Sequence, residues 1–103
     1  MTEPYSEPQA DDVKYLREVL DERGKRYGVF RDHAHIAQSL QDYIRATSGW
    51  SRLADDQRQA LTIIADKIAR ALNGDPTYAD NWVDIAGYAT LVADRLKKDY
   101  PQP

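Results

Sequence analysis

Two neighbouring segments of this chain place acidic and basic side chains beside apolar stripes. Asp80, Asp84 and Tyr88 are spaced four residues apart, so on a helix they lie along one side. Asp66 and Arg70 share a side of the preceding segment for the same reason. If the two segments pair as antiparallel helices, these sides meet. Mixed acids and bases at such a seam suit either a metal–phosphate site or a buried ion-pair network, and both interpretations stay open.

The metal–phosphate interpretation rests on carboxylates that lie one helical turn apart. Mg²⁺ is commonly held by one or two carboxylates together with the phosphates of a substrate. Asp80, Asp84 and Asp66 are therefore the candidate metal ligands, and Lys67 and Arg70 are candidates to neutralise phosphate charge. The alternative is a set of solvated ion pairs, which are common on helices and need no function.

The segment 23–28 combines three basic residues, two glycines and one tyrosine. Lys25 and Arg26 are candidates to bind phosphate, and Tyr27 is a candidate to stack against a base. Trp82 and Tyr88 are further candidates for base contact. The segment is not a Walker loop, because the Gly-Lys-Ser/Thr pattern and a preceding strand are absent. An ordinary helix-capping loop explains it equally well.

Two smaller groups offer weaker candidates. Glu18 and Glu22 lie one turn apart, where they would either complete a metal site or belong to a charged outer face. His33 and His35 are two residues apart, so they point to different sides of a helix and cannot chelate one ion together. His33, near an expected helix start, is either a pocket residue or an ordinary cap or surface histidine. No Ser–His–Asp pattern appears.

Composition narrows the class of protein. The chain has 103 residues, enough for one domain, and no cysteine, which excludes disulfides, thiolate metal sites and cysteine nucleophiles. A net charge of −3 gives no general attraction to DNA or to anionic membranes. No apolar run approaches the roughly 18 residues of a membrane span, and no signal peptide is visible. We therefore expect a cytoplasmic protein without DNA or membrane binding.

Apolar periodicity predicts an all-α chain, a compact bundle of about four helices. Residues 1–10 read as a flexible leader and residues 11–100 as one helical domain. Helices are expected over 11–23, 31–46 and 54–72, and from 77 or 78 to about 98, the last two being the longest. Gly24 is the expected stop of the first helix, and residues 25–30 a loop. Trp50 and Leu53 should plug the connection before the third helix.

Four short stretches resemble a family of small uncharacterised phage and prophage proteins. They are Arg-Tyr-Gly-Val-Phe at 26–30, Lys-Ile-Ala-Arg at 67–70, Asn-Gly-Asp-Pro at 73–76 and the stretch 80–89, and the resemblance covers about residues 15–96. It implies no particular activity.

A more distant resemblance is to the all-α nucleoside triphosphate pyrophosphohydrolases of the MazG type, mainly in the last two helices. Those enzymes hold magnesium with Glu pairs on one helix and Glu-x-x-Asp on the next. Asn81-Trp82-Val83-Asp84 stands at the second motif, and Asp66, Lys67 and Arg70 stand at the first. Asp84 is the one clean match, so the resemblance implies nucleotide binding more firmly than hydrolysis.

Residues and resemblance together lead to two function hypotheses. The first is a phage-type protein of the bacterial host cytoplasm that binds a nucleotide or nucleotide-derived metabolite, with Mg²⁺-dependent pyrophosphohydrolysis as its strongest form. The second is a non-catalytic protein-interaction module, such as a phage inhibitor of a host defence complex. The resemblance implies a homo-oligomer, and two tryptophans and seven tyrosines offer apolar area for one. The candidate nucleotide-binding residues are Lys25, Arg26, Tyr27, Lys67, Arg70, Trp82 and Tyr88, and the candidate metal ligands are Asp80, Asp84 and Asp66.

Overall fold

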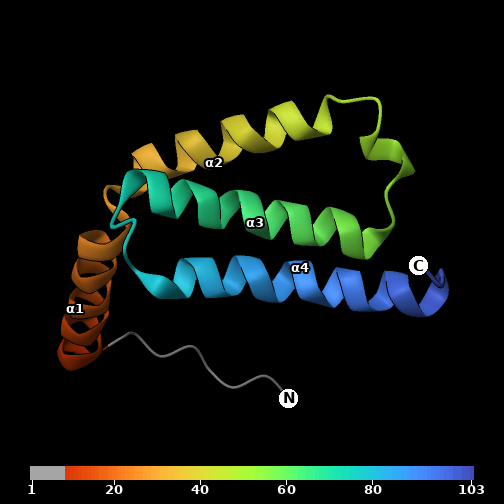
Figure 1. Ribbon diagram of the computed structural model, residues 1–103. Helices are drawn as coiled ribbons and strands as arrows, with labels where there is room; N and C mark the ends of the chain where they lie inside the picture. The colour runs from red at the N-terminus through yellow and green to blue at the C-terminus, as the bar shows by residue number, and fades with distance from the viewer. Residues whose placement is uncertain (1–8) are drawn as a thin grey trace, which may run out of the picture.

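The computed structural model describes residues 9–103, so the expected leader over 1–10 lies almost wholly outside the described residues. The elements are α1 (Ala10–Tyr27), α2 (Phe30–Arg45), a short 3₁₀ turn η1 (Trp50–Arg52), α3 (Asp55–Asn73) and α4 (Ala79–Asp99) (Figure 1). Residues 9–103 contain no strand. The predicted all-α class with four helices is confirmed.

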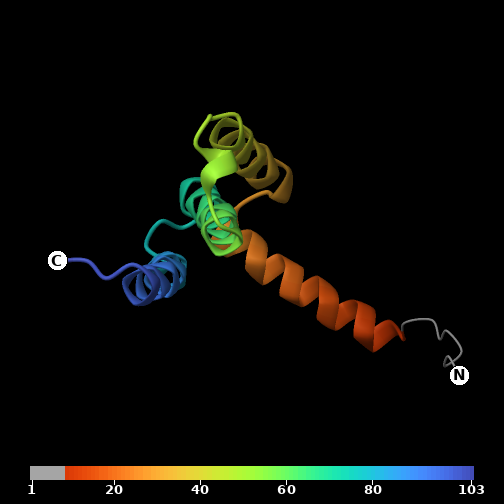
Figure 2. The same ribbon diagram turned by 90° about the vertical axis from the view of Figure 1, so that its right-hand side faces the viewer.

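Helices α2, α3 and α4 lie side by side in one layer, with α3 in the middle and each running antiparallel to its neighbour (Figure 1). Helix α1 leaves one end of this layer and projects away from it (Figure 2). The radius of gyration is 18.2 Å, against about 13 Å for a compact domain of this length. The four helices are thus arranged as a three-helix layer from which α1 projects (Figure 2).

The interior of the layer is thin and built from small side chains. The buried hydrophobic residues of the described chain are all alanines: Ala37, Ala60, Ala65 and Ala69. Alanine lets neighbouring helices approach closely, but each one removes little apolar area from water. Larger apolar side chains, including Leu16, Trp82 and Leu91, are more than half exposed. The single chain thus leaves most of its large apolar surface uncovered.

Helix α1 is longer than the sequence suggests. The helix continues through Gly24 and ends at Tyr27, with Gly28 as its C-cap at φ 79°. A glycine inside a helix costs only about 1 kcal/mol, and the basic residues Lys25 and Arg26 suit the C-terminal end of the helix dipole. The expected stop at Gly24 and the loop over 25–30 are therefore wrong, whereas the other helix ends lie within about two residues of expectation.

Two chain turns are joined by hydrogen bonds; we call residues 26–29 and 73–75 the turn junction. The amide of Asp75 donates to the Arg26 carbonyl at 2.7 Å. The Asn73 side-chain amide donates to the carbonyls of Tyr27, at 2.8 Å, and Val29, at 3.0 Å. These bonds fix the end of α1 and the start of α2 against the end of α3.

Asp75 also stabilises its own turn, which gives a pH-dependent prediction. Its carboxylate accepts bonds from the Thr77 hydroxyl and amide at 2.5 and 2.9 Å, and these lower the Asp75 pKa below 3.8. Stability from a lowered pKa is present above the unfolded value and is lost as pH falls through the folded one. We expect Thr77→Val to lower the melting temperature at neutral pH, and the difference from wild type to shrink below about pH 4. A difference that is constant with pH would contradict this role.

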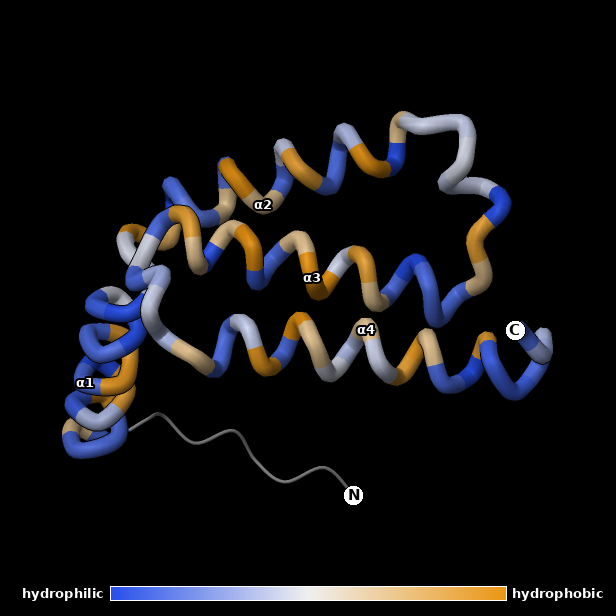
Figure 3. The backbone as a smooth tube through the Cα atoms, viewed as in Figure 1, coloured by the Kyte–Doolittle hydropathy of each residue, from blue (hydrophilic) through white to orange (hydrophobic). Residues whose placement is uncertain are grey.

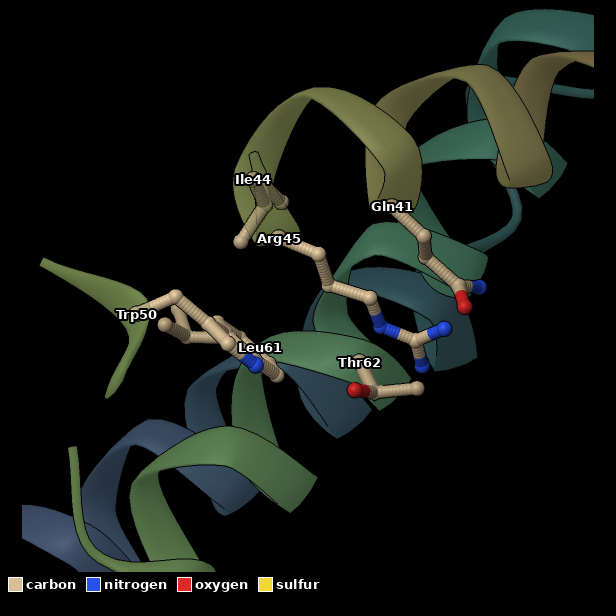
Figure 4. A pocket seen from close by; sticks show the side chains of 6 residues that line it. All are labelled: Gln41, Ile44, Arg45, Trp50, Leu61 and Thr62. Carbon is tan, nitrogen blue, oxygen red and sulfur yellow. The ribbon is translucent and has the colours of Figure 1, made fainter. Parts of the chain in front are cut away.

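The connection between α2 and α3 is filled by Trp50 (Figure 4). The guanidinium groups of Arg45 and Arg58 each lie 5.9 Å from its ring, and Arg58 donates to the Trp50 carbonyl at 3.3 Å. The adjoining depression is too shallow to enclose any volume (about 0 Å³). The residues around it are Gln41, Ile44, Arg45, Trp50, Leu61 and Thr62. This agrees with the expectation that Trp50 plugs the connection, and it leaves no room there for a ligand.

Candidate functional site

A cavity of about 600 Å³ lies where the end of α1 meets the start of α2. Its lining combines basic and aromatic side chains with small and aliphatic residues. No carboxylate residue contributes to the lining. The lining residues are Leu20, Arg23, Gly24, Tyr27, Gly28, Val29, Phe30, His33 and Arg70.

One side of the cavity is organised by Asp66, which lies between two basic side chains. His33 Nε2 lies 2.9 Å from Asp66 Oδ1, and Arg70 Nε lies 3.3 Å from Asp66 Oδ2. The Arg70 guanidinium is also 4.6 Å from the centre of the Tyr27 ring. Because a guanidinium carries five N–H donors and Asp66 engages the Nε group, Arg70 keeps donors for an anion. Asp66 therefore fixes the Arg70 guanidinium at the cavity, and N–H donors of that guanidinium remain for a ligand.

Aromatic rings form the other side of the cavity. The rings of Phe30 and His33 are stacked, with centroids 6.1 Å apart and an angle of 25°. Phe30 is 79% exposed, so one ring face is available to a planar ligand. The ring of Tyr27, which lines the cavity, lies 6.2 Å from the ring of Tyr78, which does not. The Arg26 guanidinium lies 4.3 Å from the centre of the Tyr78 ring.

His33, for which the sequence left a pocket position and an ordinary cap or surface position open, lies in the cavity wall. Its side chain is buried, and its Nδ1 atom has no hydrogen-bond partner. An unpaired buried polar atom costs about 1–3 kcal/mol, and this one belongs to a residue of the cavity wall. The two-residue spacing of His33 and His35 showed only that these two side chains cannot bind one ion together. The four-residue step from His33 to the buried Ala37 was the available signal that this histidine faces inward.

The seam between α3 and α4 contains an ion pair rather than a cavity. Lys67 Nζ lies 2.9 Å from Asp84 Oδ2, and the lysine side chain is only 15% exposed. Asn81, one turn before Asp84, is 1% exposed, and its side-chain nitrogen has no partner. Asp84 thus pairs with Lys67, whereas Asp66 and Arg70, which were expected to face this side of α4, contact each other and His33 of α2. The expected meeting of the two charged sides is wrong for Asp66 and Arg70, because α2 supplies the nearer partner of Asp66.

The three candidate metal ligands each have a different partner. Asp66 contacts His33 and Arg70, Asp84 contacts Lys67, and Asp80 accepts a 2.8 Å hydrogen bond from the Tyr78 hydroxyl. The bond to Asp80 raises the pKa of Tyr78. Within residues 9–103, no three His, Asp or Glu side chains are grouped closely enough to hold an ion. The part of the chain that the structure describes thus presents no preformed magnesium site.

The candidate nucleotide-binding residues are divided among several places. Tyr27 and Arg70 line the cavity, whereas Lys67 lies at the seam. Lys25, Trp82 and Tyr88 are not among the residues that line it; the Trp82 ring nitrogen donates to the Pro76 carbonyl at 2.9 Å.

One residue of the two smaller candidate groups, Glu22, forms an ion pair within α1. Glu22 pairs with Arg26 at 3.1 Å, as the charged-face alternative predicts for this helix. Arg23 and Phe30 join the cavity wall although neither was singled out as a site residue.

Comparison with known proteins places most of the chain in one family. Residues 14–96 match the model of the domain of unknown function DUF6378. No curated protein and no solved structure matches the chain. No helix of residues 9–103 is both long and apolar enough to cross a membrane. Because the match covers more than half of its length, the chain belongs to the DUF6378 family.

Proposed function

We propose that this chain binds a nucleotide or a nucleotide-derived metabolite in the cavity at the end of α1. The observation that carries the proposal is the lining, where Arg23, Arg70 and His33 stand beside aromatic rings and no carboxylate contributes. Arginine binds phosphate bidentately, and aromatic faces stack on bases. The volume of about 600 Å³ lies in the range of small-molecule sites.

The proposed roles follow from the contacts of each residue. Arg70, held by Asp66 and lying against Tyr27, meets the phosphate with little loss of side-chain entropy. Phe30 offers its exposed ring face to the base.

Magnesium does not fit a preformed site here, since the candidate carboxylates are separately engaged. In this proposal the ion therefore enters only as a companion of the ligand's phosphates. Turnover is the stronger form of the proposal: a nucleoside triphosphate would be split into the monophosphate and pyrophosphate. The distant MazG-type resemblance and the phage-type motifs support this form, in the cytoplasm of a bacterial host cell.

The test is calorimetric titration of the full chain with ribo- and deoxyribonucleoside mono- and triphosphates, with and without magnesium. Arg70→Gln and Arg23→Gln should each weaken binding about 10- to 100-fold, the loss of a charge-assisted hydrogen bond. Arg95→Gln is the matched control, because Arg95 pairs with Asp56 in the first turn of α3, at the opposite end of that helix from Arg70, and does not line the cavity. Equal affinities in all three variants, or no binding of any nucleotide, would overturn the proposal. Mass spectrometry of the same mixtures reports turnover.

A second candidate, a protein-interaction module such as a phage inhibitor of a host defence complex, is favoured by one observation. Helix α4 exposes Trp82, Val83 and Leu91 at 55%, 64% and 67%. Large apolar side chains gathered on one exposed helix are typical of protein interfaces. Arg70→Gln separates the two functions, since it should weaken nucleotide binding in the cavity and barely change an interaction through the exposed side chains of α4.

A further inference from the structure

Helix α1 projects from the rest of the chain as an arm with an exposed apolar stripe. None of its residues is buried, and Val13, Leu16 and Leu20 are 42%, 57% and 54% exposed. These apolar positions lie along one side of the helix (Figure 3). Isolated helices of this length are only marginally stable in water, because helical stability in proteins comes mainly from packing of the apolar face. The stripe therefore requires a second apolar surface that covers it.

We propose that the cover is a second copy of this chain, whose α1 packs antiparallel against this one across a two-fold axis. The first argument is the distribution of charge along the arm. The first turn is acidic, with Asp11 and Asp12, and the last turn is basic, with Lys25 and Arg26. In an antiparallel pair each acidic start meets a basic end, and the two-fold axis makes this contact twice.

The spacing of the stripe agrees with the same register. If Leu16 lies opposite the partner's Leu20, then Asp12 at the edge of the stripe lies beside the partner's Arg23, because residue numbers run in opposite directions. The apolar positions 13, 16 and 20 follow the three- and four-residue steps of a two-helix seam. The same register therefore allows the leucine contacts across the seam and the ionic contact at its edge.

The net charge of the arm points to the same partner. Helix α1 is neutral, although the whole chain carries −3. Polyanions and anionic membranes select helices with excess positive charge, and this arm has none. Its ten charges are five acidic residues, Asp11, Asp12, Glu18, Asp21 and Glu22, and five basic residues, Lys14, Arg17, Arg23, Lys25 and Arg26.

The exposed area is large enough for such an interface. The exposed area is 8358 Å², against about 5,900 Å² for a compact monomer of this mass. A stable interface needs about 800 Å² from each partner. The inference is argued from α1 alone, although Leu20 and Arg23 of this helix also line the cavity. The readout is therefore the mass of the assembly and not ligand binding.

The first measurement is the mass of the full chain by sedimentation equilibrium over a dilution series. We expect an even multiple of 11.8 kDa. The double variant Leu16→Glu with Leu20→Glu should halve that mass. The matched control is Tyr15→Glu, since Tyr15 lies off the stripe and is 70% exposed; its mass should be unchanged. Circular dichroism checks that each variant keeps its helices.

A charge-reversal pair tests the antiparallel arrangement itself. One variant carries Asp11→Lys and Asp12→Lys, and the other carries Arg23→Glu and Lys25→Glu. Each alone should dissociate at concentrations where the wild type is paired, and an equimolar mixture should regain the paired mass. A monomeric wild type, a stripe variant that keeps the wild-type mass, or a mixture that fails to recover would each overturn the proposal.

Discussion

Replacing Gly74 by alanine is expected to lower the free energy of unfolding by about 3 kcal/mol, the upper end of the usual range for overpacking. A Cβ at this position would overlap the Arg26 carbonyl oxygen and the Tyr27 Cα, both well inside 3.0 Å. These are backbone atoms of the turn junction, so they cannot move aside as a flexible side chain would. The same junction carries the bond from Asp75 to Arg26, which the substitution would break.

Thermal unfolding followed by circular dichroism measures this effect, and a fall of about 12 °C or more is expected for a chain of this size. Gly24→Ala is the matched control, because Gly24 is inside α1 and a Cβ there meets nothing within 4 Å. That variant should be stabilised by about 0.5–1 kcal/mol, since alanine favours the helix. If both substitutions shifted stability in the same direction, the close approach at the turn junction would be wrong.

The second large effect is expected for Asn81→Asp, which changes charge without changing shape. Asn81 is 1% exposed, and Lys67, the nearest cation at the seam, is already paired with Asp84. An uncompensated buried carboxylate costs several kcal/mol, so we expect a loss of about 3 kcal/mol at neutral pH. Gln59→Glu makes the same chemical change at an exposed position of α3 and should stay within about 0.5 kcal/mol of wild type.

The pH dependence of Asn81→Asp follows from the same burial. Burial disfavours the charged form, so the new carboxyl should have a raised pKa in the folded chain. Stability is then retained below the unfolded pKa of about 3.9 and lost as pH rises through the folded value. Melting temperatures of variant and wild type should converge near about pH 4 and diverge above it. A difference that does not depend on pH would mean that the site is not closed to water.

Most helix ends, and which residues share one side of a helix, were predictable from the sequence. Asp66 and Arg70 form the i, i+4 contact that their spacing predicts. The partner that completes their cluster, His33, is 33 residues away, and no local pattern links the two. The same holds for the bond from Asn73 to Tyr27, across 46 residues. The cavity depends on both contacts, so its position could not be derived from periodicity alone.

The metal candidates show the limit of spacing in another way. A helical step of four residues places carboxylates on one side, but it does not say which basic group of a neighbouring helix reaches each one first. Lys67 forms an ion pair with Asp84, and His33 and Arg70 both contact the Asp66 carboxylate. The end of α1 was missed for a different reason: a glycine inside a helix is tolerated when the following residues suit a C-terminus.

The end of α1 and the start of α4 are both attached at the turn junction. Residues 28–74 run out along α2 and return along α3, so the segment closes on itself at the junction. Helix α1 enters at this point, and α4 departs from it only a few residues later (Figure 1). Arg26 at the end of α1 also lies over Tyr78, the residue that caps α4. A rotation of the α1 arm would therefore be transmitted mechanically to the start of α4, with no need for any displacement within the α2–α3 pair.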